Sequence, residues 1–181
     1  FGAFAEEAFV TDQWALDEDV PPSESPHFGH PQQVVPSGFS PEVGVLSVTL
    51  KETLSWIRRF GVGEGQKVVV FGTGPVGVAF VLFSRRLGAE QVVLVGRTPA
   101  SIERAAALCA PDATLNVMDG DISRRIIEVT DGGADKIVEG VGDTTIIDQG
   151  VAALAPGGRV GIYGLAPSTQ AAAAHADDAR V

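Results

Sequence analysis

The sequence predicts an α/β domain in which helices cover both faces of a doubly wound, parallel sheet. Short β-branched runs alternate with segments of helical spacing from Glu42 to about Leu165, a pattern typical of βαβ units. A glycine-rich turn joins one of these runs directly to a helical segment. Apolar residues make up 45% and charged residues 20% of the 181 residues, which are ordinary globular values.

The elements follow one another in a regular order along the chain. Runs such as KVVVF and QVVLV are typical of strands buried on both faces. Strands are expected over 67–71, 91–95, 113–117, 136–139 and 159–163. Helices are expected over 47–60, 76–87, 99–109, 122–129 and 144–154.

The alternating region, 43–166, is flanked by segments of different composition. Residues 12–42 are rich in proline, serine and acidic residues, and their prolines are expected to interrupt any regular element. They are predicted to form a connector or an extended surface loop. Residues 167–181 form an alanine-rich tail that is expected to be loosely held.

The glycine turn carries the strongest functional signal. Gly72, Thr73, Gly74, Pro75, Val76 and Gly77 fit the G-x-G-x-x-G pattern. The first glycine permits a sharp turn, the second admits a pyrophosphate close to the backbone, and the third lets the helix approach the strand. Because the turn follows a predicted buried strand and opens a predicted helix, we expect it to bind a dinucleotide.

The end of the second strand determines which cofactor is expected. NAD sites usually have Asp or Glu there, which accepts hydrogen bonds from the ribose 2′-hydroxyl. This chain has Gly96, Arg97 and Thr98 instead. An arginine can bind a 2′-phosphate through two hydrogen bonds, and a threonine can add a hydroxyl. The sequence therefore predicts NADP(H) in preference to NAD(H), unless Arg97 is only a solvated or adenine-stacking loop residue.

Charge and cysteine content exclude several classes of protein. The net charge of −10 disfavours binding to nucleic acids and to anionic membrane surfaces. No run approaches the about 18 apolar residues of a membrane-spanning helix. The single cysteine, Cys109, excludes an internal disulfide and a cysteine-rich metal site. A cytoplasmic location is expected.

Four stretches together resemble the cofactor-binding half of the medium-chain dehydrogenase/reductases, the zinc alcohol dehydrogenase superfamily. They are GVGEGQKVVVFGTGPVG at 61–77, RRLGAEQVVLVGRT at 85–98, GADKIVEGVG at 133–142 and ALAPGGRVGIYG at 153–164. Residues 2–6 are similar to the last strand of that family's catalytic domain. The resemblance makes residues 1–11 a remnant of that domain.

This resemblance implies a six-stranded Rossmann domain, paired with a catalytic domain that precedes it. It implies hydride transfer between a nicotinamide and a small-molecule alcohol, carbonyl or activated alkene. It places Val141 and Gly142 near the adenosine ribose and diphosphate, and Gly164 and Leu165 near the nicotinamide. A homo-oligomer is also in keeping with the family.

The sequence also departs from the family. The catalytic lobe and its first zinc ligands are absent, and Val48-Thr49-Leu50 stands where polyol-dehydrogenase-like members have Glu-Pro-Leu. We therefore expect a fragment with no metal ligands of its own, inactive by itself, which leaves open whether the longer protein uses zinc. Catalytic residues are not assigned.

Two other hypotheses remain beside the enzyme. A non-catalytic module that senses NADPH would also lack a catalytic constellation. A methyltransferase with a similar sheet is disfavoured, because such enzymes usually carry an acid at the end of the second strand.

Several single residues have structural interpretations as well. His27 and His30 are expected to be surface histidines of the connector more than metal ligands. Cys109, Trp56 and Tyr163 are expected to serve packing. The role of Glu139 is left undecided between structure and cofactor cleft.

Overall fold

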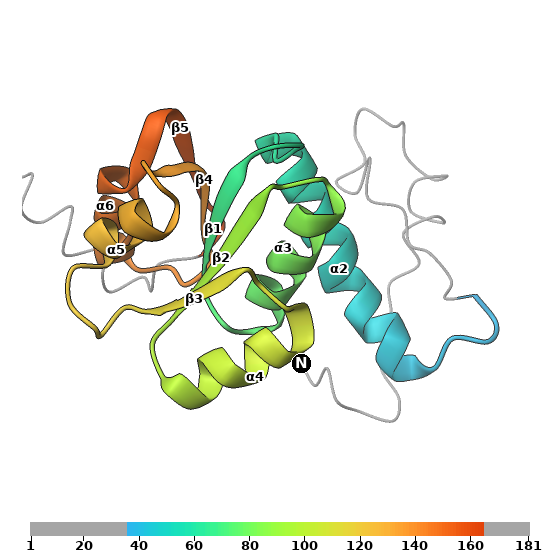
Figure 1. Ribbon diagram of the computed structural model, residues 1–181. Helices are drawn as coiled ribbons and strands as arrows, with labels where there is room; N and C mark the ends of the chain where they lie inside the picture. Colours follow the sequence, from blue (N-terminus) through green and yellow to red (C-terminus); the bar gives the residue numbers. More distant parts are fainter. Residues whose placement is uncertain (1–35, 165–181) are drawn as a thin grey trace, which may run out of the picture. The chain divides into compact units, whose positions relative to one another are not determined.

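The computed structural model describes residues 36–164 of the chain (Figure 1). These residues form a Rossmann-type α/β fold, so the predicted fold class is confirmed. The chain divides into two units after Gly44, inside the first described helix, and the sheet belongs to the unit from Val45 onward. None of the helices within 36–164 is long and apolar enough to cross a membrane.

Five parallel strands form the sheet in the order β3-β2-β1-β4-β5. The strands are β1 (Lys67–Phe71), β2 (Gln91–Gly96), β3 (Ala113–Asn116), β4 (Ala134–Glu139) and β5 (Leu154–Ile162). Strand β1 pairs with β2 on one side and with β4 on the other. The chain order therefore reverses at β1, and crossovers leave from both sides of this strand, which creates a crevice at the carboxyl ends of the strands.

Helices cover both faces of this sheet, as Figure 1 shows. They are α2 (Pro41–Phe60), α3 (Pro75–Arg86), α4 (Pro99–Cys109), α5 (Ile122–Val129) and α6 (Thr144–Ala152). The face with Val68 and Val70 packs against α2 from Val45 onward, α3 and α4. The opposite face, with Val69 and Phe71, packs against α5 and α6.

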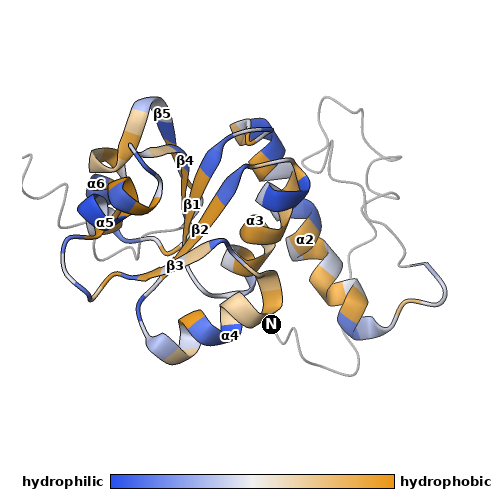
Figure 2. Ribbon diagram, viewed as in Figure 1, coloured by the Kyte–Doolittle hydropathy of each residue, from blue (hydrophilic) through white to orange (hydrophobic). Residues whose placement is uncertain are grey.

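The central strands have the composition that this burial requires. The residues Val68, Val69, Val70 and Phe71 are at most 1% exposed, and Figure 2 shows the apolar colour along β1 and β2. A strand between two helical layers buries both rows of its side chains, so it reads as a continuous apolar run. This is why β1 has the bounds that the sequence predicts.

An aromatic cluster packs α2 and α3 against the end of β5. The ring of Trp56 lies 5.0 Å from that of Phe60 and 5.3 Å from that of Phe80, and Tyr163 meets Trp56 edge-on at 5.6 Å. Burial, and then the hydrogen bond and negative charge of Glu52, raise the pKa of Tyr163. The rings thus hold α2 and α3 to the end of β5, and the packing role predicted for Trp56 and Tyr163 is confirmed.

Two predicted element boundaries differ from the structure by more than two residues. Helix α2 begins at Pro41, not at residue 47, because a proline fits the first turn of a helix, where its missing N–H has no partner to lose. Strand β5 begins at Leu154, not at residue 159, and a register shift separates its two halves. Gly157 has φ +82° within that irregular stretch, which an edge strand can accommodate.

The sixth strand that the resemblance implies is not among residues 36–164. The remnant at 1–11, residues 12–35 of the connector with His27 and His30, Leu165, and the tail at 167–181 lie outside the described residues.

Asp112 fastens the turn before β3 to the sheet. Its Oδ2 accepts a hydrogen bond from the amide of Val92 at 2.8 Å, and its Oδ1 lies 2.9 Å from Nη1 of Arg85. Burial by itself raises the pKa of Asp112, but the bonds from Val92 and Arg85 together hold this pKa below its ordinary value. The ionised carboxyl is therefore favoured in the folded chain.

Asp112→Asn should make the stability of the fold less sensitive to acid. A carboxyl whose folded pKa is depressed stabilises at neutral pH, and that contribution is lost as the pH falls below about 4. The side chains of Arg85 and Asp112 are 43% and 39% exposed. Solvent screening therefore limits the contribution of this carboxyl to the free energy of unfolding to about 1 kcal/mol. Thermal unfolding at pH 7 and pH 3 measures it. If the wild type and Asp112→Asn lost equal stability between pH 7 and pH 3, this role of Asp112 would be contradicted.

Candidate functional site: a cleft at the carboxyl ends of the strands

The glycine turn leads from β1 into α3. Gly72 has φ +125°, a conformation that favours glycine, and its amide donates to the carbonyl of Val95 at 3.0 Å. A Cβ on Gly77 would overlap the carbonyl oxygen of Gly72, so the helix lies as close to the turn as a glycine allows. Gly72 and Gly77 are therefore required by the fold itself.

Gly74 differs from these two glycines. It precedes α3 with φ −78° and ψ 179°, an extended conformation open to other residues. A Cβ built on it would meet no atom of the protein within 4 Å. Pro75 occupies the first turn of α3, and Val76 packs against the core. The space beside Gly74 and the amino end of α3 is thus free for a ligand.

A cleft of about 630 Å³ lies along this edge of the sheet. The ends of β1 and β2, the segments after β3 and β4, and the start of α6 line it. The predicted site residues that line the cleft are Gly72, Thr73, Gly74, Gly96, Arg97 and Val141. The other predicted site residues within 36–164 do not line it: Pro75, Val76, Gly77, Thr98, Gly142 and Gly164.

The residues after β2 have three different surroundings. Arg97 is exposed and makes no hydrogen bond or ion pair with any residue of 36–164. Thr98 instead precedes α4, and its hydroxyl donates to Oγ of Ser101 at 2.9 Å. A Cβ on Gly96 would lie 2.5 Å from Cγ1 of Ile102, so close packing against Ile102 also requires glycine at this position. Of these three residues, Arg97 alone carries a charge, and its guanidinium has no polar partner within residues 36–164.

The segments after β4 and β5 meet behind the cleft. Val141 is 52% exposed, whereas Gly142 is buried with φ +84°. Gly164 packs so closely that a Cβ on it would overlap the amide nitrogen of Gly142. Gly142 and Gly164 thus shape the wall, and Val141 contacts the open space.

Part of the cleft lining was missed in the sequence. It is formed by Val117 and Met118 after β3, and by Asp143, Thr145, Ile146 and Gln149 around the start of α6. Asp143 caps the start of α6, and its Oδ1 accepts a hydrogen bond from the amide of Thr145 at 2.9 Å. The rule that carboxyl ends of parallel strands share one edge pointed to these loops, but it did not indicate which side chains face the cleft.

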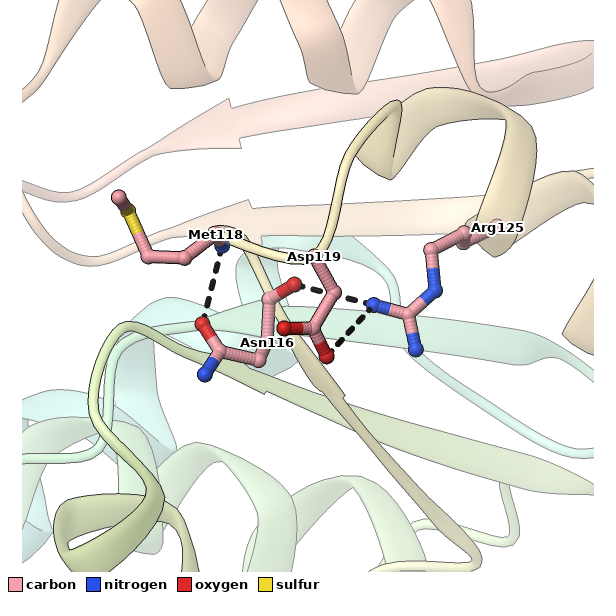
Figure 3. A network of polar contacts seen from close by, with 4 residues as sticks. All are labelled: Asn116, Met118, Asp119 and Arg125. Atoms are coloured by element: carbon pink, nitrogen blue, oxygen red, sulfur yellow. Dashed lines mark hydrogen bonds and ion pairs between the residues drawn. The ribbon is translucent and has the colours of Figure 1, made fainter.

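A polar network holds the loop that carries Met118 (Figure 3). Nη1 of Arg125 donates to the carbonyl of Asn116 at 3.1 Å and lies 3.3 Å from Oδ2 of Asp119. Oδ1 of Asn116 accepts from the amide of Met118 at 2.9 Å. The loop is therefore tied to α5, and Met118, 65% exposed, is held at the cleft.

Other candidate chemistry is absent from the described part of the chain. Within residues 36–164 no group of three or more His, Cys, Asp or Glu side chains is arranged to hold a metal ion. Cys109 is buried and its Sγ donates to the carbonyl of Ala105 at 3.0 Å. Burial raises the pKa of this thiol, so it stays protonated at neutral pH, as its predicted packing role requires.

Comparison with known proteins agrees with this arrangement. The model of the zinc-binding dehydrogenase family matches residues 75–178. A geraniol dehydrogenase of Castellaniella defragrans is 35% identical over 60% of this chain and 29% of its own length. An NADP-dependent isopropanol dehydrogenase of Entamoeba histolytica is 37% identical over 71% of this chain and 35% of its own length.

Solved structures show the same fold. A zinc-binding dehydrogenase from Sinorhizobium meliloti 1021, bound to NADP, matches with a TM-score of 0.68 at 26% identity. The match covers 74% of this chain and 40% of that one. The chain thus spans less than half the length of the proteins that it matches.

Proposed function

The chain belongs to the zinc-binding dehydrogenase family, and we propose that its cleft binds NADP(H) as the cofactor half of an oxidoreductase. The contrast between Gly74 and Gly77 carries this proposal. Packing within the chain accounts for glycine at 77, but nothing within 4 Å accounts for it at 74. A ligand that approaches the backbone as closely as a pyrophosphate does would account for it.

The residues around Gly74 suit an anionic dinucleotide. Helix α3 starts directly after Gly74, which lines the cleft, so the positive end of the helix dipole lies beside the cleft and favours a diphosphate. The cleft's 630 Å³ falls within the range typical of small-molecule and cofactor sites. When bound, the nicotinamide supplies the hydride chemistry, while this chain binds and orients the cofactor.

The preference for NADP(H) depends on Arg97. Arg97 lines the cleft and its guanidinium has no partner within residues 36–164, so it is available to a 2′-phosphate. The relative from Entamoeba histolytica is NADP-dependent, and the similar structure from Sinorhizobium meliloti holds NADP. Both support the preference.

For the longer protein, we propose hydride transfer between nicotinamide and a small alcohol or carbonyl compound, or an activated alkene. The alcohol dehydrogenases among the relatives support the alcohol or carbonyl compound. No step of this transfer is assigned to zinc, because residues 36–164 contain no suitable group of ligands.

Chemical-shift mapping tests where the cofactor binds. NADP⁺ added to the ¹⁵N-labelled chain should perturb the amides of 72–74, 76–77, 96–98 and 141–142, which follow three different strands. Perturbation confined to the outer surfaces of α5 and α6 would overturn the proposed site.

A further inference from the structure

Glu139 is an unusual residue for the centre of this fold. It ends β4, between β1 and β5, and its side chain is completely buried. Burial of a carboxylate is costly unless its oxygens accept hydrogen bonds. The surroundings of its two oxygens therefore indicate what it does.

One oxygen organises the loop that follows β4. Oε1 accepts hydrogen bonds from the amides of Val141 at 2.6 Å and Gly142 at 2.7 Å. Bonds of this length to a carboxylate are among the stronger hydrogen bonds in proteins. Val141 is 52% exposed, so the carboxylate anchors a loop that reaches the surface of the protein. The carboxylate therefore dictates how residues 140–142 turn toward α6.

The other oxygen faces the end of β5. Oε2 is buried and has no hydrogen-bond partner among residues 36–164. It would lie 2.8 Å from a Cβ on Gly164, so the carboxylate is wedged against that backbone. The carbonyl of Glu139 also accepts from the amides of Tyr163 at 2.8 Å and Gly164 at 3.0 Å. Side chain and backbone of Glu139 together hold the end of β5.

The same loop lies against the glycine turn. The amide of Gly140 donates to the carbonyl of Phe71 at 3.0 Å. A Cβ on Gly72 would lie 3.5 Å from the carbonyl oxygen of Gly140 and 3.7 Å from Cγ2 of Val141. The glycine turn and the end of β5 thus both contact the segment 139–142.

We propose that Glu139 is a positioning residue, whose carboxylate fixes the 140–142 loop against the glycine turn and the end of β5. The consequence for the cofactor rests on the proposed function. Strands β4 and β2 are separated by β1, so the end of β4 lies about 10 Å from the end of β2, which Arg97 follows. Loss of the carboxylate should therefore weaken binding of the diphosphate and nicotinamide more than binding of the adenosine 2′-phosphate.

Glu139→Gln removes the charge and keeps the shape. In one orientation the NH2 group of the glutamine takes the buried position of Oε2, and a neutral oxygen is left to accept from Val141 and Gly142. In the other orientation the NH2 group meets the two N–H donors of Val141 and Gly142. Glu90→Gln removes the same charge from an exposed site and serves as the control.

Amide hydrogen exchange of the free 181-residue chain tests the positioning. Exchange at Val141 and Gly142 should be slow in the wild type and at least about tenfold faster in Glu139→Gln, but unchanged in Glu90→Gln. If Glu139→Gln does not fold, the wild type alone still tests the proposal. Fast exchange at the amide of Val141 in the wild type would overturn it.

Binding of NADPH and of adenosine 2′,5′-bisphosphate tests the consequence. Glu139→Gln should weaken NADPH about tenfold or more and the bisphosphate less than about threefold. Equal weakening of both would refute a local positioning role. If the wild type binds neither compound, the proposed function and this consequence fail, while the exchange experiment still decides whether Glu139 positions the loop.

Discussion

Replacing Arg97 by alanine is expected to weaken NADPH binding by about 1.5–3 kcal/mol, which is about 10- to 150-fold. A hydrogen bond to a charged group has this strength, and the guanidinium of Arg97 has no competing partner within residues 36–164. NADH lacks the 2′-phosphate, so its affinity should change by less than about twofold. Calorimetric titration of wild type and variant with both cofactors measures the difference.

Arg104→Ala is the matched control, because it removes an exposed positive charge from α4 outside the cleft. Arg104→Ala should change the affinity for NADPH only slightly, through the loss of one positive charge, and this change should shrink as the salt concentration rises. Equal weakening of NADPH and NADH by Arg97→Ala would mean that Arg97 stacks on adenine or supports the loop, and would contradict its role in cofactor choice.

Gly74→Ala should abolish most cofactor binding and leave the fold intact. The new methyl group has open space in the free protein, and the backbone at φ −78° accepts alanine. In the complex the methyl would occupy the space of the pyrophosphate, at a cost on the scale of overpacking, about 1–3 kcal/mol or 5- to 150-fold in affinity. Thermal unfolding and NADPH titration of the same preparation separate the two effects.

Gly77→Ala is the counterpart of that variant. Its methyl group would overlap the carbonyl oxygen of Gly72, so α3 must move away from the turn. Because both clashing groups belong to the backbone, the free energy of unfolding of this variant should fall by about 3 kcal/mol or more. If Gly74→Ala also lowered the stability, or bound NADPH as the wild type does, the assignment of Gly74 to the ligand would be wrong.

The fold was predictable where burial leaves a local signature. Strand β1 lies between two helical layers, and its run of valines gave its bounds correctly. Helices α4 and α5 were also predicted with correct bounds, because Pro99 starts the first and Asp121 caps the second. The four motif stretches identified the family that the comparison confirms.

The site was predictable only in part. The glycine turn is continuous in sequence, so its pattern could be recognised. The wall with Met118 and Asp143 is formed by loops that only the sheet brings together, and no local pattern marks which of their side chains face the cleft. Gly96 and Thr98 also make contacts, with Ile102 and Ser101 respectively, that no pattern in the sequence marks.

Titration of the 181-residue chain with NADPH, NADH and S-adenosylmethionine, followed by nicotinamide fluorescence and by heat, tests the central claim most directly. The structure of the cleft predicts binding of NADPH, weaker binding of NADH and none of S-adenosylmethionine. Tighter binding of NADH would contradict the role of Arg97. Binding of neither nicotinamide cofactor, or measurable heat with S-adenosylmethionine, would contradict the proposal that this cleft is an NADP(H) site.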